Sequence, residues 1–252
     1  MTKNLPIKLG IAINSLYLIC VISFVIAIAH NHAKLISHEF PLDYNEAGML
    51  VITSTIAHGG NPYSLESQPS QMSVYPPLYN IFVAPLSRVF GNTLELHRIF
   101  SGLFIMACAA LCFYLCRRDS GARAESFIAA ALVYAGLLFY STPIASPNGL
   151  GLFLFLAAIT VPWVNGFSTR SLAVTIVLGI LAFYTKQYFI ACLGYVALYL
   201  FLAESKKHAI CFGLAALAAF IVVLALVCYT SPYYLEDTFF AVQSGSKLAA
   251  FS

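Results

Sequence analysis

Charged residues are scarce in this sequence. Aspartate, glutamate, lysine and arginine make up 9% of the 252 residues, whereas a soluble domain carries roughly 25%. Hydrophobic residues make up 60%, and the mean hydropathy is +0.84. The net charge of +3 is small. The basic residues form no clustered basic face of the kind that nucleic-acid-binding proteins carry. This composition excludes a soluble globular domain and predicts no nucleic-acid partner.

Two other patterns are missing. None of the seven cysteines belongs to a CxxC pair, so the spacing typical of zinc and redox sites is absent. No alternating segments of about ten residues indicate a membrane β-barrel. The sequence contains instead a series of apolar runs of about 16–22 residues, which span or nearly span a bilayer core of about 30 Å. We therefore expect an all-α, polytopic helical membrane protein that forms a single membrane domain over residues 1–252.

The positions of lysine and arginine predict how the chain is threaded. Residues 9–29 form the first span, and the lysines before it place the N-terminus in the cytoplasm, because cytoplasmic segments are rich in basic residues. Residues 30–96 then form an extracytoplasmic loop. Six further spans follow within 97–229, which makes about seven transmembrane helices. Residues 230–252 form an extracytoplasmic tail without a closing helix, and we expect the chain to be the N-terminal part of a longer protein.

The loop at 30–96 is the one long stretch outside the continuous apolar runs. Apolar residues at helical spacing in 44–58 predict a short helix along the membrane surface, which a Gly-Gly pair ends. Residues 75–90 are apolar too, but three prolines interrupt them. A crossing there would also place the arginines at 117–123 outside the membrane. We interpret this segment as a second interfacial or re-entrant helix on the outer face.

Asp43 and Glu46 are the candidate catalytic residues. Their spacing of three places both carboxylates on one side of a helical turn. Such a pair can act as a general base with an orienting partner, or can hold a divalent cation through oxygen ligands. The same spacing is typical of a capping box, in which Asp43 caps the helix and Glu46 reaches back to it. These interpretations stay open, and a divalent cation is the only cofactor that the sequence suggests.

Two cations near the outer face are candidates for binding an anion. Lys186 lies between two apolar runs, where a lysine costs about 3 kcal/mol and marks a functional site by default. The alternative is a lysine that snorkels to the interface. Arg98 opens a span on the outer side, against the positive-inside trend. It predicts either an anionic partner or a salt bridge to Glu95 or another loop carboxylate.

Aromatic and amide side chains complete the candidate site. The tyrosines of the outer loop are suited to stacking on a sugar or a polar head group, although interfacial tyrosines also form the usual aromatic belt. An asparagine that follows a proline is either a polar contact or a helix cap. These further candidates for substrate binding are Tyr63, Tyr75, Tyr79, Gln187 and Asn148.

The order of these motifs resembles one family. An acidic motif at 43–48 is followed by a Gly-x-Pro-Tyr turn at 60–63, a Tyr-Pro-Pro-Leu segment at 75–78, a Phe-Gly turn at 90–91, Arg98 and a Phe-Tyr-Thr-Lys-Gln motif at 183–187. This pattern resembles the GT-C type integral-membrane glycosyltransferases, which include the aminoarabinose transferase of lipid A and the protein O-mannosyltransferases. The resemblance covers essentially the whole chain.

The resemblance implies a reaction and a place. A sugar would move from a polyprenyl-phosphate donor to a lipid, glycan or protein acceptor, with inversion of its anomeric carbon. Asp43 or Glu46 would deprotonate the acceptor hydroxyl, and Lys186 and Arg98 would contact the leaving phosphate. The resemblance also implies an integral membrane protein of the cell envelope, in the inner (plasma) membrane of a bacterium, which acts on the extracytoplasmic face.

The sequence also departs from this family. Relatives often have Asp-Glu where this chain has Asn45-Glu46, often have Asp near Asn148, and usually have more spans. Two other functions stay open. A lipid or solute transporter or flippase would carry polar groups at the bilayer midplane, whereas this chain keeps them at the outer rim. A non-catalytic membrane assembly subunit would use the outer loop to bind a partner.

Overall fold

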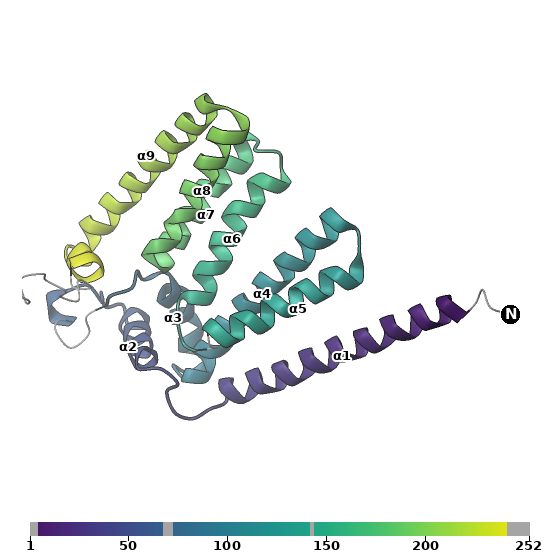
Figure 1. Cartoon of the computed structure of the whole chain (residues 1–252). Coiled ribbons are helices and arrows are strands. Elements are labelled where there is room, and N and C mark those ends of the chain that lie inside the picture. Colours follow the sequence, from purple (N-terminus) through teal and green to yellow (C-terminus); the bar gives the residue numbers. More distant parts are fainter. Residues whose placement is uncertain (1–4, 68–72, 142–143, 241–252) are drawn as a thin grey trace, which may run out of the picture.

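The structure is a computed structural model that describes residues 5–67, 73–141 and 144–240. Every regular element in these ranges is helical (Figure 1). The α-helices are α1 (Leu5–Ile36), α2 (Asn45–Ala57), α3 (Leu78–Phe90), α4 (Leu94–Ser120), α5 (Arg123–Ser141), α6 (Asn148–Val164), α7 (Thr169–Thr185), α8 (Ala191–Tyr199) and α9 (Lys206–Thr230). Short 3-10 or π turns are η1 (Leu65–Ser67), η2 (Gln187–Ile190), η3 (Leu200–Glu204) and η4 (Glu236–Phe240).

The prediction of an all-helical chain is confirmed for the described residues, and several helices suit a membrane. Four are long and apolar enough to cross one: Ala12–Ile36, Leu94–Ser120, Gln187–Glu204 and Lys206–Thr230. Three more are apolar but shorter: Leu78–Phe90, Asn148–Val164 and Thr169–Thr185. The total of about seven spans stays a prediction. The last part of the predicted tail, 241–252, lies outside the described residues.

The first helix is longer than the span predicted at 9–29. It continues to Ile36 because no glycine or proline interrupts residues 30–36, and because His32 packs onto the hairpin of α4 and α5. The Nδ1 atom of His32 lies 2.7 Å from the Tyr134 hydroxyl. Its ring also fills the space beside Gly102, where a Cβ atom would lie 2.9 Å from the imidazole. The first part of the predicted loop is therefore helical.

The long helices run back and forth between two ends of a bundle (Figure 1). α4 and α5 form one hairpin, α6 and α7 form a second, and α4 packs against α6. The C-terminal ends of α1, α5, α7 and α9 and the N-terminal ends of α4 and α6 lie at the same end of the bundle as α2 and α3. The turns at the opposite end carry six cations: Arg117, Arg118, Arg123, Arg170, Lys206 and Lys207.

Buried polar groups join α2 to α3. The Asn80 amide on α3 donates to the Met49 carbonyl at 3.0 Å and to the Thr53 hydroxyl at 2.9 Å, both on α2. A shared apolar core then holds this pair on α6 and α7. Its buried members are Met49, Ile52, Tyr79, Val83, Leu150, Leu154 and Ala182. After α2 the chain turns away at Gly59, whose φ of 81° suits glycine, as the Gly-Gly pair predicted.

The two ends of the bundle should be reachable from opposite sides of a membrane. Tyr44, which is 87% exposed, lies at the start of α2, whereas Lys207 is exposed in the first turn of α9 at the other end. In a background without the seven native cysteines, we expect Tyr44→Cys to react with an impermeant maleimide on intact cells. Lys207→Cys should react only after permeabilisation. Labelling of both positions from outside would contradict the alternating path of the helices.

Candidate functional site

A fully buried ion pair lies where α2 meets α4. Arg98 near the start of α4 and Glu46 in the first turn of α2 are 0% exposed. The Nε and Nη2 atoms of Arg98 donate to the two carboxylate oxygens of Glu46 at 2.9 and 2.7 Å, in a bidentate arrangement. Of the salt bridges that the sequence left open for Arg98, the structure shows the one to Glu46.

The rest of the Arg98 guanidinium holds the chain that follows α1. Its Nη1 donates to the carbonyls of Leu35 at 3.2 Å and His38 at 2.5 Å, and its Nη2 donates to that of Phe40 at 2.8 Å. All the N–H groups of this side chain are therefore engaged within the protein. The guanidinium has no donor left for a phosphate, so Arg98 is not placed to make the phosphate contact predicted for it.

Glu46 also accepts hydrogen bonds from two backbone amides. The Leu42 amide donates to Oε2 at 2.6 Å, and the Ala145 amide donates to Oε1 at 2.7 Å. Burial alone would raise the pKa of this carboxyl, but the hydrogen bonds from Arg98 and the two amides outweigh burial and hold the pKa below its ordinary value. Glu46 is therefore held ionised as a buried anchor for three separate segments.

The segment between α5 and α6 is fixed by the same group of contacts. The Ser101 hydroxyl on α4 donates to the Ser146 carbonyl at 3.0 Å, and the Ser146 hydroxyl accepts from the Asn148 amide at 3.2 Å. Gly149 permits the close approach of α6 to α4, because a Cβ atom there would lie 2.8 Å from the Ser101 carbonyl oxygen. These contacts place the Asn148 side chain at the start of α6.

A small cavity of about 140 Å³ lies against this segment. Four of the residues selected from the sequence line it, namely Asp43, Tyr75, Asn148 and Lys186. The other lining residues are Asn45, Met49, Ile144, Ala145, Ser146 and Pro147. The structure thus brings together an acid, a lysine, an amide and an aromatic ring from four separate parts of the chain. We call this cavity the outer pocket.

An amide and two aromatic rings orient Lys186 in the outer pocket. Its Nζ atom donates to Asn148 Oδ1 at 2.8 Å. The same atom lies 4.9 Å from the Tyr75 ring centroid and 5.0 Å from that of Tyr188, and such cation–π contacts hold the ammonium over the ring faces without neutralising its charge. No carboxylate among the described residues forms an ion pair with Lys186. Its charge therefore remains free for an anionic ligand.

Asp43 lies on the outer pocket with one carboxylate oxygen engaged. Its Oδ1 accepts hydrogen bonds from the backbone amide and the side-chain amide of Asn45, each at 2.8 Å. Its Oδ2 has no hydrogen-bond partner within the described parts of the chain. The capping box forms only in part, because Glu46 reaches back to the Leu42 amide and not to Asp43. A carboxylate that is held by one oxygen is suited to accept a proton with the other.

Three further residues selected from the sequence do not line the outer pocket, and two of them support it. The Tyr63 side chain is 2% exposed, and its hydroxyl donates to the Tyr75 carbonyl at 2.6 Å. The Gln187 amide donates to the Val74 carbonyl at 3.1 Å, so both residues hold the backbone that carries the Tyr75 ring. Tyr79 is fully buried in the core beneath α2 and α3. Burial raises the pKa of the Tyr63 and Tyr79 phenols, so both stay protonated.

Sequence reasoning missed three contributors to this region. The Ala145 amide donates to Glu46, the Tyr188 ring forms a second cation–π contact with Lys186, and Asn45 donates to Asp43. A backbone amide leaves no signal in a sequence pattern. Tyr188 and Asn45 did carry one, because each lies within two residues of a selected side chain.

Comparisons with known proteins identify no relative of this chain. No protein-family model matches the chain, and neither the curated proteins nor the solved structures contain a significant match.

Removing one partner of the buried ion pair should destabilise the fold. Such a change leaves an uncompensated buried charge and costs about 3–5 kcal/mol. We expect Glu46→Gln and Arg98→Met each to lower the Tm of the purified protein in detergent. The matched control is Glu66→Gln, at an exposed acid, and should melt like the wild type. Equal melting of Glu46→Gln and Glu66→Gln would contradict the anchoring role.

The same pair predicts an acid-sensitive component of stability. Because the folded-state pKa of Glu46 is lowered, its contribution is complete above the ordinary value of 4.5 and is lost as the pH falls through the lower folded value. The difference in unfolding free energy between wild type and Glu46→Gln should therefore shrink as the pH falls below 4.5 and through the folded-state pKa. Denaturant titrations from neutral to strongly acidic buffer measure it, and a difference that stays constant would refute the predicted pKa direction.

Proposed function

We propose that this chain is the membrane domain of a glycosyltransferase, or the N-terminal part of one, that uses a lipid-linked sugar. One observation carries the proposal: the Asp43 carboxylate and the Lys186 ammonium line the same small cavity. A general base for the acceptor and a cation for the departing phosphate are the two groups that such a transfer requires. The ring of Tyr75 supplies a wall on which a sugar can stack.

In the proposed reaction Asp43 and Lys186 act on opposite sides of the sugar. The free Oδ2 of Asp43 accepts the proton of the acceptor hydroxyl as that oxygen bonds to the anomeric carbon. The bond from that carbon to the phosphate oxygen breaks with its electron pair on the phosphate, so the configuration inverts. The Lys186 ammonium, which Asn148 holds in place, stabilises the charge that develops on the leaving phosphate.

Asp43, rather than Glu46, is the proposed base because hydrogen bonds occupy both carboxylate oxygens of Glu46. Both oxygens of Glu46 are engaged by Arg98 and by backbone amides, whereas one oxygen of Asp43 has no partner among the described residues. Glu46 and Arg98 instead act as positioning residues. They hold the segment that carries Asn148 and, through it, the orientation of Lys186.

The proposed donor is a sugar on a polyprenyl phosphate or diphosphate, and the proposed acceptor is a lipid, a glycan or a protein hydroxyl. Lys186 supports a lipid-borne phosphate because it directly follows the apolar helix α7. Within the described ranges no three His, Cys, Asp or Glu side chains gather as a metal site. A divalent cation bound at Asp43 would take its remaining ligands from phosphate oxygens and water.

The proposed topology has about seven spans, a cytoplasmic N-terminus and α2 and α3 as interfacial helices. The six cations at the end opposite the outer pocket support it, because basic turns stay in the cytoplasm. The outer pocket would then face the extracytoplasmic side of the inner membrane of a bacterium.

The test is an assay of sugar release from a panel of polyprenyl-phosphate sugars by the longest native form of the protein. Asp43→Asn should lower kcat by about 10²–10⁴-fold, the usual contribution of a general base. Lys186→Ala should lower it by about 10²–10³-fold, as for a lost charge-stabilising group. The controls Glu66→Gln and Lys34→Ala remove an exposed acid and an exposed lysine away from the outer pocket and should keep full turnover.

The outcomes separate the assignments. Loss of turnover in Asp43→Asn at an unchanged Tm would support the base. Full turnover in Asp43→Asn would exclude it. An absence of both turnover and donor binding across the panel would favour the assembly subunit, whose outer loop binds a partner and whose phenotype would survive substitution of Asp43.

A further inference from the structure

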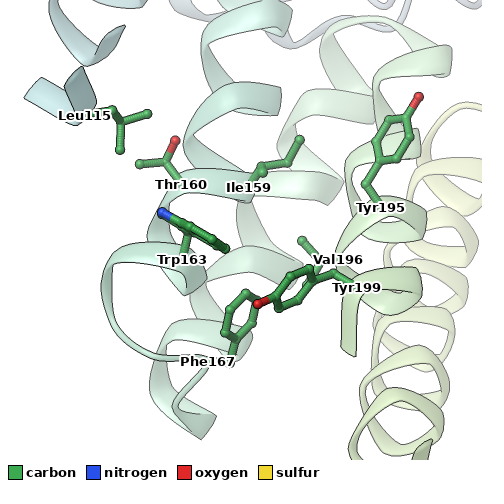
Figure 2. A pocket seen from close by; sticks show the side chains of 8 residues that line it. All are labelled: Leu115, Ile159, Thr160, Trp163, Phe167, Tyr195, Val196 and Tyr199. Carbon is green, nitrogen blue, oxygen red and sulfur yellow. The ribbon is translucent and has the colours of Figure 1, made fainter. Parts of the chain in front are cut away.

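A second cavity lies toward the opposite end of the bundle from the outer pocket. It is a groove of about 260 Å³ between α4, α6 and α8, and aromatic rings form much of its wall (Figure 2). The rings of Phe167 and Tyr199 stack with centroids 4.7 Å apart, and Trp163 meets Tyr199 edge-on at 5.9 Å. Because Trp163 and Tyr195 are 50% and 58% exposed, the groove opens to the side of the bundle. We call it the aromatic groove.

The aromatic groove carries polar atoms that no described residue engages. The Thr160 hydroxyl, the Trp163 indole N–H and the hydroxyls of Tyr195 and Tyr199 have no hydrogen-bond partner in the part of the chain that the structure describes. Figure 2 shows the indole nitrogen on the side of the ring that faces Thr160 and Leu115. Unpaired donors and acceptors are costly in a membrane, so a ligand with acceptor groups would stabilise this lining.

The backbone beside the aromatic groove is strained. Phe167 is the one described non-glycine residue with a positive φ, at 53°. An aromatic residue rarely adopts this left-handed conformation, which persists only where the surrounding structure requires it. Here the conformation accompanies the stacking of the Phe167 ring on Tyr199. The turn after α6 therefore completes the wall of the groove at a conformational cost.

A cation, Arg118, contacts the backbone next to the aromatic groove. The Nη2 atom of Arg118 donates to the Val164 carbonyl at 3.2 Å, directly after Trp163, and Leu115 lies one turn before Arg118 on α4 and lines the groove. The other N–H groups of Arg118 have no partner among the described residues, and Asp119 forms no ion pair with it. These remaining N–H groups are therefore available to an anion.

The surrounding charge is basic as well. The helix ends on this side carry Arg117, Arg118, Arg123, Arg170, Lys206 and Lys207 against Asp119, Glu125 and Glu204. Such an excess attracts anionic lipid head groups, each basic residue near the surface strengthening the attraction.

We infer that the aromatic groove binds an anionic phospholipid, with one acyl chain against Trp163 and Tyr199 and its phosphate on Arg118. The aromatic rings suit an acyl chain, the unpaired Trp163 indole N–H suits an ester carbonyl, and the remaining N–H groups of Arg118 suit the phosphate of such a lipid. A zwitterionic lipid offers the same chain but no net charge. The aromatic groove contains neither Asp43 nor Lys186, so lipid binding there is independent of the proposed reaction.

The test uses fluorescence, because Trp163 is the only tryptophan in the chain. The full chain is reconstituted in phosphatidylcholine vesicles that contain increasing fractions of phosphatidylglycerol or phosphatidylcholine with brominated acyl chains. Bromine quenches a tryptophan that it contacts. We expect half-maximal quenching at an about fivefold lower fraction of the anionic lipid, the effect of one basic residue at a membrane surface.

Matched variants locate the preference. Arg118→Gln should bring the two quenching curves together, whereas Lys207→Gln, which removes an equal charge on α9 at the same end, should keep them apart. Arg118→Lys keeps the charge and should retain most of the preference. Equal quenching by both lipids in the wild type would overturn the inference without the use of any variant. An anionic preference that survives in Arg118→Gln would overturn it too.

Discussion

The bidentate contact between Arg98 and Glu46 is the interaction on which the outer end of the molecule depends. It joins the chain after α1, the first turn of α2, the start of α4 and the segment before α6. Two buried charges are costly unless each is fully hydrogen-bonded, and here the guanidinium and the carboxylate both are. Asp43 lies three residues before Glu46, and Asn148 lies three residues after Ala145. The positions of both on the outer pocket therefore follow from this pair.

Four charged residues at the outer end have two different kinds of surroundings. Arg98 and Glu46 are buried and neutralise each other, so they hold neighbouring segments of the chain in position. Asp43 and Lys186 line the outer pocket and keep a free oxygen and a free charge, so they are the ones suited to act on a ligand. Tyr63 and Gln187 have a supporting role, because their hydrogen bonds hold the backbone that carries the Tyr75 ring in the outer pocket.

Much of this could be predicted from the sequence, and the reason is the cost of polar groups at membrane depth. Lys186 and Asn148 stand out among apolar runs, and the structure places both on the outer pocket. The separate fates of Asp43 and Glu46 could not be predicted, since both have the same chemistry. What separates them is a side chain 52 residues from Glu46 and a backbone amide 99 residues from it. The extension of α1 also depends on a distant contact, that of His32 with Tyr134.

The long first helix combines two kinds of constraint. The most apolar stretch of Ala12–Ile36 has no buried residue, whereas its last turns pack on α4 and α5 through His32. Along the exposed part, the surroundings select only for hydropathy and length, so one apolar side chain can replace another at little cost. Along the last two turns they select for shape and hydrogen bonding, and few exchanges are neutral. Tolerance to substitution should thus change abruptly within this one continuous helix, where the exposed apolar part gives way to the turns around His32.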